Sequence, residues 1–64
     1  MPFVTISMYE GRTMDQKREL VKGVTEVVSR VAQVPLEGVE IVINEVRREN
    51  WSFGGLLSPD REQK

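Results

Sequence analysis

Two stretches decide the fold: residues 2–9, PFVTISMY, and residues 39–46, VEIVINEV. In the first stretch, apolar side chains alternate with small polar ones, which is the period-two pattern of a β-strand. The second stretch is rich in β-branched residues and apolar on more than one face, as is typical of a strand buried on both sides. We therefore predict two strands, joined by the long segment that lies between them.

The joining segment carries the signals of a single helix. Thr13-Met14-Asp15-Gln16 matches a capping box, in which the threonine side chain caps the helix and the glutamine reaches back. The helix should continue to about Gln33, because Pro35 disfavours helical backbone in the residue before it. Its apolar residues recur at steps of one, three and four, which places them on one stripe. They are Leu20, Val21, Val24, Val27, Val28 and Val31, and Lys22, Glu26 and Arg30 lie opposite.

A strand, a connecting helix and a second strand form a βαβ unit, so the two strands should be parallel and the crossover right-handed. Farther along, Gly54-Gly55 separates Trp51-Ser52-Phe53 from Leu56-Leu57. This pattern predicts a β-hairpin, because glycine accepts the positive φ angles of a tight turn. The expected fold class is α/β: a single βαβ unit plus a C-terminal β-hairpin, in one domain of residues 1–64. Polar residues 58–64 are expected to be loose.

The length of the chain indicates that it needs partners. A chain of 64 residues rarely builds a sufficient core alone, and small domains usually rely on a disulfide, a metal or another subunit. The absence of Cys and His excludes disulfides, thiolate chemistry, zinc clusters and an imidazole base, so we expect no metal site. We expect oligomerisation to complete the two-stranded core sheet, with the helix on one face and another copy on the other. Any active site would then lie at a subunit boundary.

Charge and hydropathy narrow the classes of partner. The net charge is −1, so the overall balance attracts neither nucleic acid nor an acidic membrane. There is no long apolar run of the kind that spans a bilayer or directs secretion. The expected partner is therefore a small molecule, with no nucleic acid and no membrane, and the expected location is the cytoplasm.

Pro2 is the first candidate for chemistry. Methionine aminopeptidase removes an initiator methionine when the next residue is small, and its action here would leave Pro2 with a free secondary amine held rigid by its ring. An α-amino group ordinarily titrates at about 7.7–8.0. Burial or a nearby positive charge lowers such a pKa, and a base that titrates near the working pH is an efficient proton carrier. Met1, if retained, would turn this nitrogen into an amide that is not basic.

Two other residues could assist such a base. Arg12 lies in the turn after the first strand, roughly 30 Å from its own Pro2 if the chain is fully extended, so it could serve only a neighbour's amine. The simpler interpretation of Arg12 is a solvated residue in a turn.

Trp51 is the single Trp, and it could form an apolar wall or simply anchor an interface. Arg47 and Arg48 could bind an anion, although the flanking glutamates favour a charge-compensated loop.

These features together resemble the 4-oxalocrotonate tautomerase family of the tautomerase superfamily. The resemblance rests on Pro2, Glu10-Gly11-Arg12, Asp15-Gln16-Lys17 at the helix start, Pro35-Leu36, a Val- and Ile-rich second strand, and an aromatic residue near Gly54-Gly55. It implies small subunits assembled as hexamers of three dimers, an amino-terminal proline as general base, and no cofactor. By this resemblance Pro2 is the catalytic base, Arg12 binds a substrate carboxylate from an adjacent subunit, and Trp51 forms the apolar wall. Phe53 and Tyr9 would line the same pocket.

One position departs from the family pattern. Glu40 stands where well-studied members carry a second arginine, which would bind the other end of a dicarboxylate. A carboxylate there would repel an anionic substrate. Arg47 or Arg48 could compensate, a second type of subunit could supply the missing arginine in a heterohexamer, or the substrate could be less charged.

The expected function is that of an isomerase, a cofactor-free enol–keto tautomerase for small unsaturated or aromatic 2-hydroxy or 2-keto acids that resemble 2-hydroxymuconate. Its activity on dicarboxylates should be weak because of Glu40. Two alternatives stay open. One is a hydratase, dehalogenase or decarboxylase of the same superfamily, which uses a protonated proline as acid. The other is an inactive self-assembling structural subunit.

Overall fold

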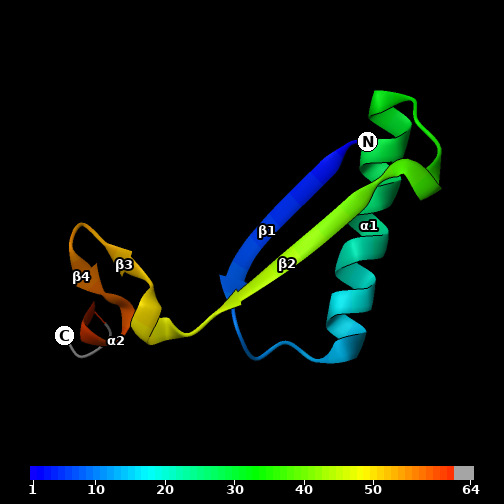
Figure 1. The fold of residues 1–64 in the computed structure, drawn as a ribbon. Coiled ribbons are helices and arrows are strands. Elements are labelled where there is room, and N and C mark those ends of the chain that lie inside the picture. The colour runs from blue at the N-terminus through cyan, green and yellow to red at the C-terminus, as the bar shows by residue number, and fades with distance from the viewer. Residues whose placement is uncertain (62–64) are drawn as a thin grey trace.

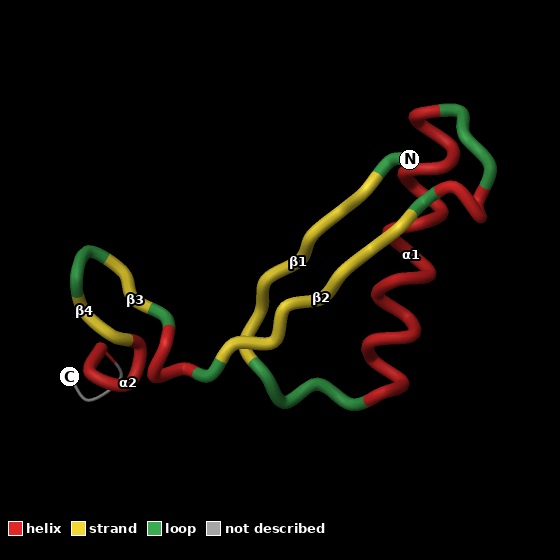
Figure 2. The backbone as a smooth tube through the Cα atoms, viewed as in Figure 1, coloured by secondary structure: helices red, strands yellow, loops and turns green. Residues whose placement is uncertain are grey.

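The computed structural model describes residues 1–61. Its elements are β1 (Phe3–Tyr9), α1 (Met14–Ala32), the short 3₁₀ turn η1 (Leu36–Gly38), β2 (Glu40–Val46), a second 3₁₀ turn η2 (Arg48–Asn50), β3 (Ser52–Phe53), β4 (Leu56–Leu57) and α2 (Ser58–Arg61). Figures 1 and 2 show α1 lying across the β1–β2 pair, while the segment after β2 extends away as a separate arm. The predicted βαβ unit and C-terminal hairpin are both confirmed.

The core sheet contains two parallel strands. The register runs from Phe3 opposite Glu40 to Tyr9 opposite Val46. Burial alternates along both strands, so one face of the sheet lies under α1 and the other is open. Lys17 of α1 forms an ion pair of 2.9 Å with Glu45 of β2 on the covered face. The first half of the helix therefore lies over the carboxyl end of β2.

Local sequence signals account for the ends of α1. The Thr13 hydroxyl accepts a hydrogen bond from the Gln16 amide at 3.1 Å, and the Gln16 side chain accepts one from the Thr13 amide at 2.9 Å. The predicted capping box is therefore present. At the other end, Gln33 adopts the left-handed conformation and its amide bonds the Ser29 carbonyl, which closes the helix just before Pro35.

The arm (residues 47–61) contains the hairpin and the short helix α2. Gly54 and Gly55 both have positive φ angles, of 60° and 86°, as a two-residue turn of this kind requires. The expectation of a loose C-terminal segment is wrong for residues 58–61, because they form α2 and Ser58 is only 2% exposed. The rest of that expectation concerns residues 62–64, which lie outside the described residues.

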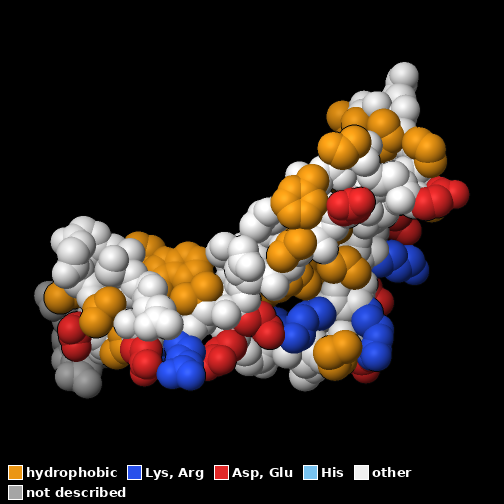
Figure 3. Space-filling view, in the orientation of Figure 1, with side chains coloured by type: hydrophobic (Ala, Val, Ile, Leu, Met, Phe, Trp, Pro, Cys, Tyr) orange, Lys and Arg blue, Asp and Glu red, His pale blue; other side chains and the backbone are white. Residues whose placement is uncertain are grey.

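The single chain leaves its apolar surface uncovered. Within residues 1–61 no hydrophobic side chain is buried, and Val42, on the open face of the sheet, is 42% exposed. The second strand is thus not covered on both sides within one chain. The radius of gyration is 15.1 Å, whereas a compact domain of this length has about 11 Å. Figure 3 shows hydrophobic side chains lying open both over the β1–β2 region and on the arm.

None of the helices in the described residues has the length and apolarity that a membrane span requires.

Candidate active site

Pro2 lies at the amino end of the core sheet, directly before β1. Its carbonyl accepts a hydrogen bond of 3.0 Å from the Glu40 amide, so the first residue of β2 fixes its main chain. The Met1 amino group donates a 2.7 Å hydrogen bond to the Gly38 carbonyl. Pro2 itself is half-buried. A nitrogen freed by loss of Met1 would therefore lie on an ordered, partly desolvated strand start.

Glu40 is the first residue of β2, and its main chain is bonded to that of Pro2. It pairs with Phe3, the residue that follows Pro2, and both Glu40 and Phe3 are exposed. Paired residues of parallel strands project to the same face of a sheet. A carboxylate, rather than the arginine of the family pattern, therefore stands at this end of the chain.

Arg12 lies beyond the opposite end of β1. Gly11, with a φ of 119°, permits the sharp change of direction between β1 and α1. Arg12 is exposed and, within the part of the chain that the structure describes, makes no ion pair or hydrogen bond. A guanidinium without an internal partner is well suited to bind an external carboxylate in a bidentate manner.

Trp51 belongs to a cluster that joins the arm to the sheet. Its ring meets the Tyr9 ring edge-on, with centroids 5.1 Å apart and planes at 71°. The Tyr9 hydroxyl is hydrogen-bonded to the Ser58 hydroxyl, and the Ser58 amide donates a 2.8 Å bond to the Trp51 carbonyl. The Arg48 guanidinium lies over the Tyr9 ring, 4.3 Å from its centroid. We call these four residues, Tyr9, Arg48, Trp51 and Ser58, the joint cluster.

The structure brings some predicted residues to one end of the sheet and leaves another at the far end. Arg12 follows Tyr9 by three positions and Trp51 follows Val46 by five, and Tyr9 and Val46 are partners in the register. Both therefore follow the carboxyl ends of the two parallel strands. Pro2 lies at the amino end, about 23 Å away by the rise of an extended strand. A single chain cannot unite the three predicted residues.

Sequence reasoning gave only part of the joint cluster. It named Tyr9 as a pocket residue and left Arg48 undecided between two roles. It missed Ser58, which is the only buried residue among the described ones. No local signal marks Ser58, because its partner Tyr9 is 49 positions away in the sequence. Phe53, also predicted to line the pocket, is 46% exposed and has the Arg61 guanidinium 4.1 Å from its ring centroid.

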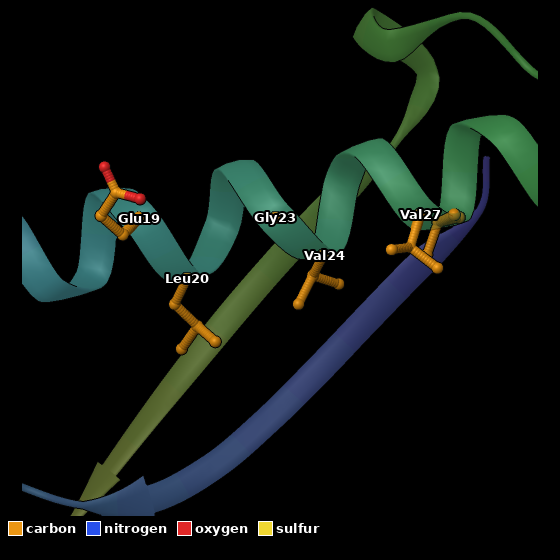
Figure 4. A pocket seen from close by; sticks show the side chains of 6 residues that line it. Glu19, Leu20, Gly23, Val24 and Val27 are labelled. Atoms are coloured by element: carbon orange, nitrogen blue, oxygen red, sulfur yellow. The ribbon is translucent and has the colours of Figure 1, made fainter.

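An apolar hollow lies elsewhere, along α1. Its lining residues are Glu19, Leu20, Gly23, Val24, Val27 and Val28. Figure 4 shows Leu20 and Val24 projecting to one side of the helix, away from Glu19. None of the predicted site residues lines this hollow, and it offers few polar groups to an acid. In residues 1–61 no group of three acidic side chains is placed to hold a metal ion.

Comparison with known proteins gives consistent relatives. The family model described as "Tautomerase enzyme" matches residues 2–61. A protein of Listeria monocytogenes named as a probable tautomerase is 45% identical over 60 residues, which span 94% of this chain and 98% of that protein. A Streptococcus pyogenes protein also named as a probable tautomerase is 52% identical over 46 residues, or 72% of this chain and 75% of its own length.

Solved structures agree. A 4-oxalocrotonate tautomerase isozyme from Methylibium petroleiphilum superposes with a TM-score of 0.87 at 37% identity, covering 94% of this chain and 97% of that chain. A heterohexamer 4-oxalocrotonate tautomerase from Chloroflexus aurantiacus superposes with a TM-score of 0.88 at 33% identity, with the same coverage of 94% and 97%. The β1–α1–β2 unit with its hairpin arm, and a family match over residues 2–61, thus show that this chain belongs to the tautomerase family.

Proposed function

We propose that this chain is a cofactor-free enol–keto tautomerase that uses Pro2 as its general base after removal of Met1. The substrates are small unsaturated or aromatic 2-hydroxy or 2-keto acids that resemble 2-hydroxymuconate. The observation that carries the proposal is the placement of the groups: Pro2 at one end of the sheet, and Arg12 and Trp51 beyond the other. This placement supports a site built from two or more copies.

The chemistry needs no group beyond these side chains. The neutral Pro2 amine takes the proton from the enol hydroxyl, the electron pair moves along the conjugated chain, and the same nitrogen returns a proton to carbon. Arg12 of an adjacent copy binds the substrate carboxylate, which orients the chain for this transfer. Trp51 supplies an apolar wall that excludes water and favours the neutral form of the amine.

The assembly that we propose is a hexamer built as a trimer of dimers. Its support is the open apolar surface of the single chain, including Val27 at 51% and Val31 at 69% exposure on α1. The Chloroflexus aurantiacus relative is a heterohexamer, so a second kind of subunit is an alternative composition for this assembly.

Glu40 limits the substrate range in this proposal. A carboxylate beside Pro2 repels the second anionic group of a dicarboxylate, so such substrates should be turned over more slowly than monoacids. The charge of the distal substituent, rather than the size of the substrate, is then the main source of selectivity.

A direct test replaces the proposed base. Pro2→Ala, prepared with Met1 removal verified by intact mass, should lose about 10²- to 10⁴-fold in kcat, the usual contribution of a positioned general base. Pro35→Ala is the matched control, because it removes a proline that lies outside the site, between α1 and η1. Turnover of enols and α-keto acids that is equal in Pro2→Ala and wild type would contradict the proposal. A complete lack of turnover in both would favour an inactive structural subunit.

A second candidate function is favoured by the position of Glu40. A carboxylate near an amine stabilises the protonated form, and a protonated proline can act as an acid in hydration, dehalogenation or decarboxylation of small acids. The two candidates differ in their pH profiles. A base-catalysed reaction gains rate as the pH rises through the pKa of Pro2, whereas an acid-catalysed one loses rate over the same range.

A further inference from the structure

Ser58 is the one residue that the fold of the single chain buries. Among residues 1–61 no hydrophobic side chain is buried, whereas Ser58 is only 2% exposed. Burying a hydroxyl costs free energy unless it is hydrogen-bonded, and the Ser58 hydroxyl is bonded to the Tyr9 hydroxyl. What Ser58 contributes at this position is therefore a hydrogen bond rather than buried apolar surface.

Ser58 is attached to the sheet and to the arm at the same time. Its side chain is bonded to Tyr9, the last residue of β1, while its amide donates a 2.8 Å hydrogen bond to the Trp51 carbonyl. The edge contact between the Tyr9 and Trp51 rings, with centroids 5.1 Å apart, completes a closed circuit of three residues. Each contact in such a circuit restrains the other two, so the direction of the Trp51 ring depends on the hydroxyl of another residue.

Trp51 keeps part of its surface open. The residue is half-buried, and it lies beyond the carboxyl end of β2, at the start of the hairpin in the arm (Figure 1). Its amide donates a 3.2 Å hydrogen bond to the Arg48 carbonyl, so its main chain is bonded through both its N–H and its C=O. The remaining freedom lies in the side-chain torsions, which the contact with Tyr9 limits. A ring held in this way can contact a neighbouring copy without being reordered.

Ser58 itself cannot act on a substrate. At 2% exposure its hydroxyl is closed to a small molecule, and the chain has no histidine that could activate it as a nucleophile. Any influence of Ser58 on a reaction must therefore pass through a residue that it holds. Within the circuit, Trp51 is the residue that the proposed function places at the reacting amine.

We infer that Ser58 is a positioning residue of the proposed active site: through Tyr9 it holds the Trp51 ring in the direction that excludes water from the Pro2 amine of a neighbouring copy. This inference rests on the proposed function. It adds to the site a residue that does not contact the substrate, and it accounts for a buried hydroxyl at the point where the arm meets the sheet.

The test is a double-mutant cycle on protein whose Met1 removal is verified by intact mass. Ser58→Ala removes the hydroxyl but keeps the amide bond to Trp51. It should lower kcat/KM for enol phenylpyruvate by about three- to tenfold, which is less than the roughly 10²-fold cost of a 1 Å misplacement in a site. In the Trp51→Ala background the same substitution should change kcat/KM by less than about twofold, because the ring through which it acts is absent.

Ser52→Ala is the matched control. Ser52 is adjacent to Trp51 in the sequence but exposed in β3, so this variant should keep the wild-type kcat/KM. Quenching of the fluorescence of Trp51, the single Trp of the chain, by acrylamide should increase in Ser58→Ala and stay unchanged in Ser52→Ala.

A role of Ser58 in stability alone gives a different result. A less stable chain loses activity in both backgrounds, so an equal loss of kcat/KM with and without the Trp51 ring would overturn the inference. Wild-type kcat/KM in Ser58→Ala, or unchanged quenching of Trp51, would overturn it as well.

Tyr9→Phe covers the case in which Ser58→Ala fails to fold or assemble. This variant removes the same hydrogen bond from the side of β1 and keeps the ring that contacts Trp51. It should lower kcat/KM by a similar factor, again only while the Trp51 ring is present. An equal loss in both backgrounds would contradict the inference here too.

Pro2→Ala in the same assay separates this inference from the proposed function. If Pro2→Ala is as active as wild type, the proposed function fails, and the role of Ser58 fails with it. If turnover depends on Pro2 but Ser58→Ala or Trp51→Ala is as active as wild type, the proposed base stands and the inference about Ser58 is wrong.

Discussion

In the proposed function, the charge at position 40 influences the protonation state of the Pro2 amine. The Glu40 amide is bonded to the Pro2 carbonyl at 3.0 Å, so the carboxylate belongs to the residue that fixes the proposed base. An adjacent negative charge favours the cationic form of an amine and raises its pKa. The family pattern, with an arginine here, has the opposite electrostatic effect. In the proposed site, the side chain at position 40 therefore favours either the neutral amine, which acts as a base, or the cationic amine, which acts as an acid.

Glu40→Gln should lower the pKa of the processed Pro2 amine, since the variant removes the charge that stabilises the cation. A base is active when neutral, so the rising limb of kcat/KM against pH should move to lower pH. The measurement is a pH–rate profile of the free enzyme on a monocarboxylate enol. Glu37→Gln is the matched control, because it removes an exposed carboxylate from η1 rather than from β2.

The control decides the interpretation of this shift. If both glutamine variants move the limb equally, net charge rather than the position of Glu40 controls the amine. A limb that moves to higher pH would contradict the electrostatic account itself.

At the scale of elements, the arm is attached to the sheet through few contacts. The main ones are the Tyr9–Ser58 hydrogen bond, the Tyr9–Trp51 edge contact and the Arg48 guanidinium over the Tyr9 ring. Because Tyr9 ends β1 and its three partners belong to the arm, the orientation of Trp51 depends on this attachment. The apolar wall of the proposed site is thus only as rigid as the joint cluster.

Tyr9→Phe should loosen the arm. The variant keeps the ring but leaves the buried Ser58 hydroxyl without its partner, which costs about 1–3 kcal/mol for such a group. Faster hydrogen exchange of the Ser58 amide and a shift in the fluorescence of Trp51, the single Trp of the chain, would report the change. Ser52→Ala, at an exposed site of β3, should leave both signals unaltered. Unchanged exchange at Ser58 in Tyr9→Phe would show that other contacts hold the arm.

The elements were predictable where their causes are local. The capping box at Thr13, the stop before Pro35 and the turn at Gly54-Gly55 each depend on neighbouring residues, and the structure confirms them. Parallel pairing followed from the length of the crossover, which spans α1. The strands β1 and β2 each begin one residue later than predicted and end where predicted, a difference that is usual for element boundaries.

The joint cluster was not predictable in the same way. The contact between Tyr9 and Ser58 spans 49 positions and has no signature in the residues around either partner. The expectation of a loose tail was wrong at residues 58–61 for this reason. Their polar composition suggested exposure and gave no sign that the Ser58 side chain is buried. For the site, the sequence indicated that Arg12 is remote from its own Pro2, and the two ends of the sheet on which they lie agree with that expectation. Their roles in catalysis stay predictions.

At the scale of the whole molecule, the proposed function gives each copy one part of two different sites. Pro2 lies before the amino end of β1, and Arg12 and Trp51 lie beyond the carboxyl ends of β1 and β2. In a closed symmetric assembly, the amino end of one chain can meet the carboxyl end of another, so each site would draw its groups from two chains. Loss of one part in a chain therefore leaves its other part usable.

Two inactive variants should consequently restore activity when combined. Pro2→Ala and Arg12→Ala should each be nearly inactive alone, but unfolding and refolding an equal mixture should regenerate about a quarter of the wild-type sites if the copies assort at random. The measurement is the specific activity of the mixture against each parent treated in the same way. A mixture no more active than its parents would show that the site is formed within one chain, or that Arg12 has no part in it.

The separation of the two parts has an evolutionary consequence. After duplication of the gene, one daughter could lose its proline and the other its arginine, and the mixed assembly would still contain complete sites while the two proteins are made together. Each would then depend on its sister, and selection would preserve both. A chain that contributes a different catalytic group from each of its ends can therefore pass in few mutations from one gene that suffices alone to two genes that are both required.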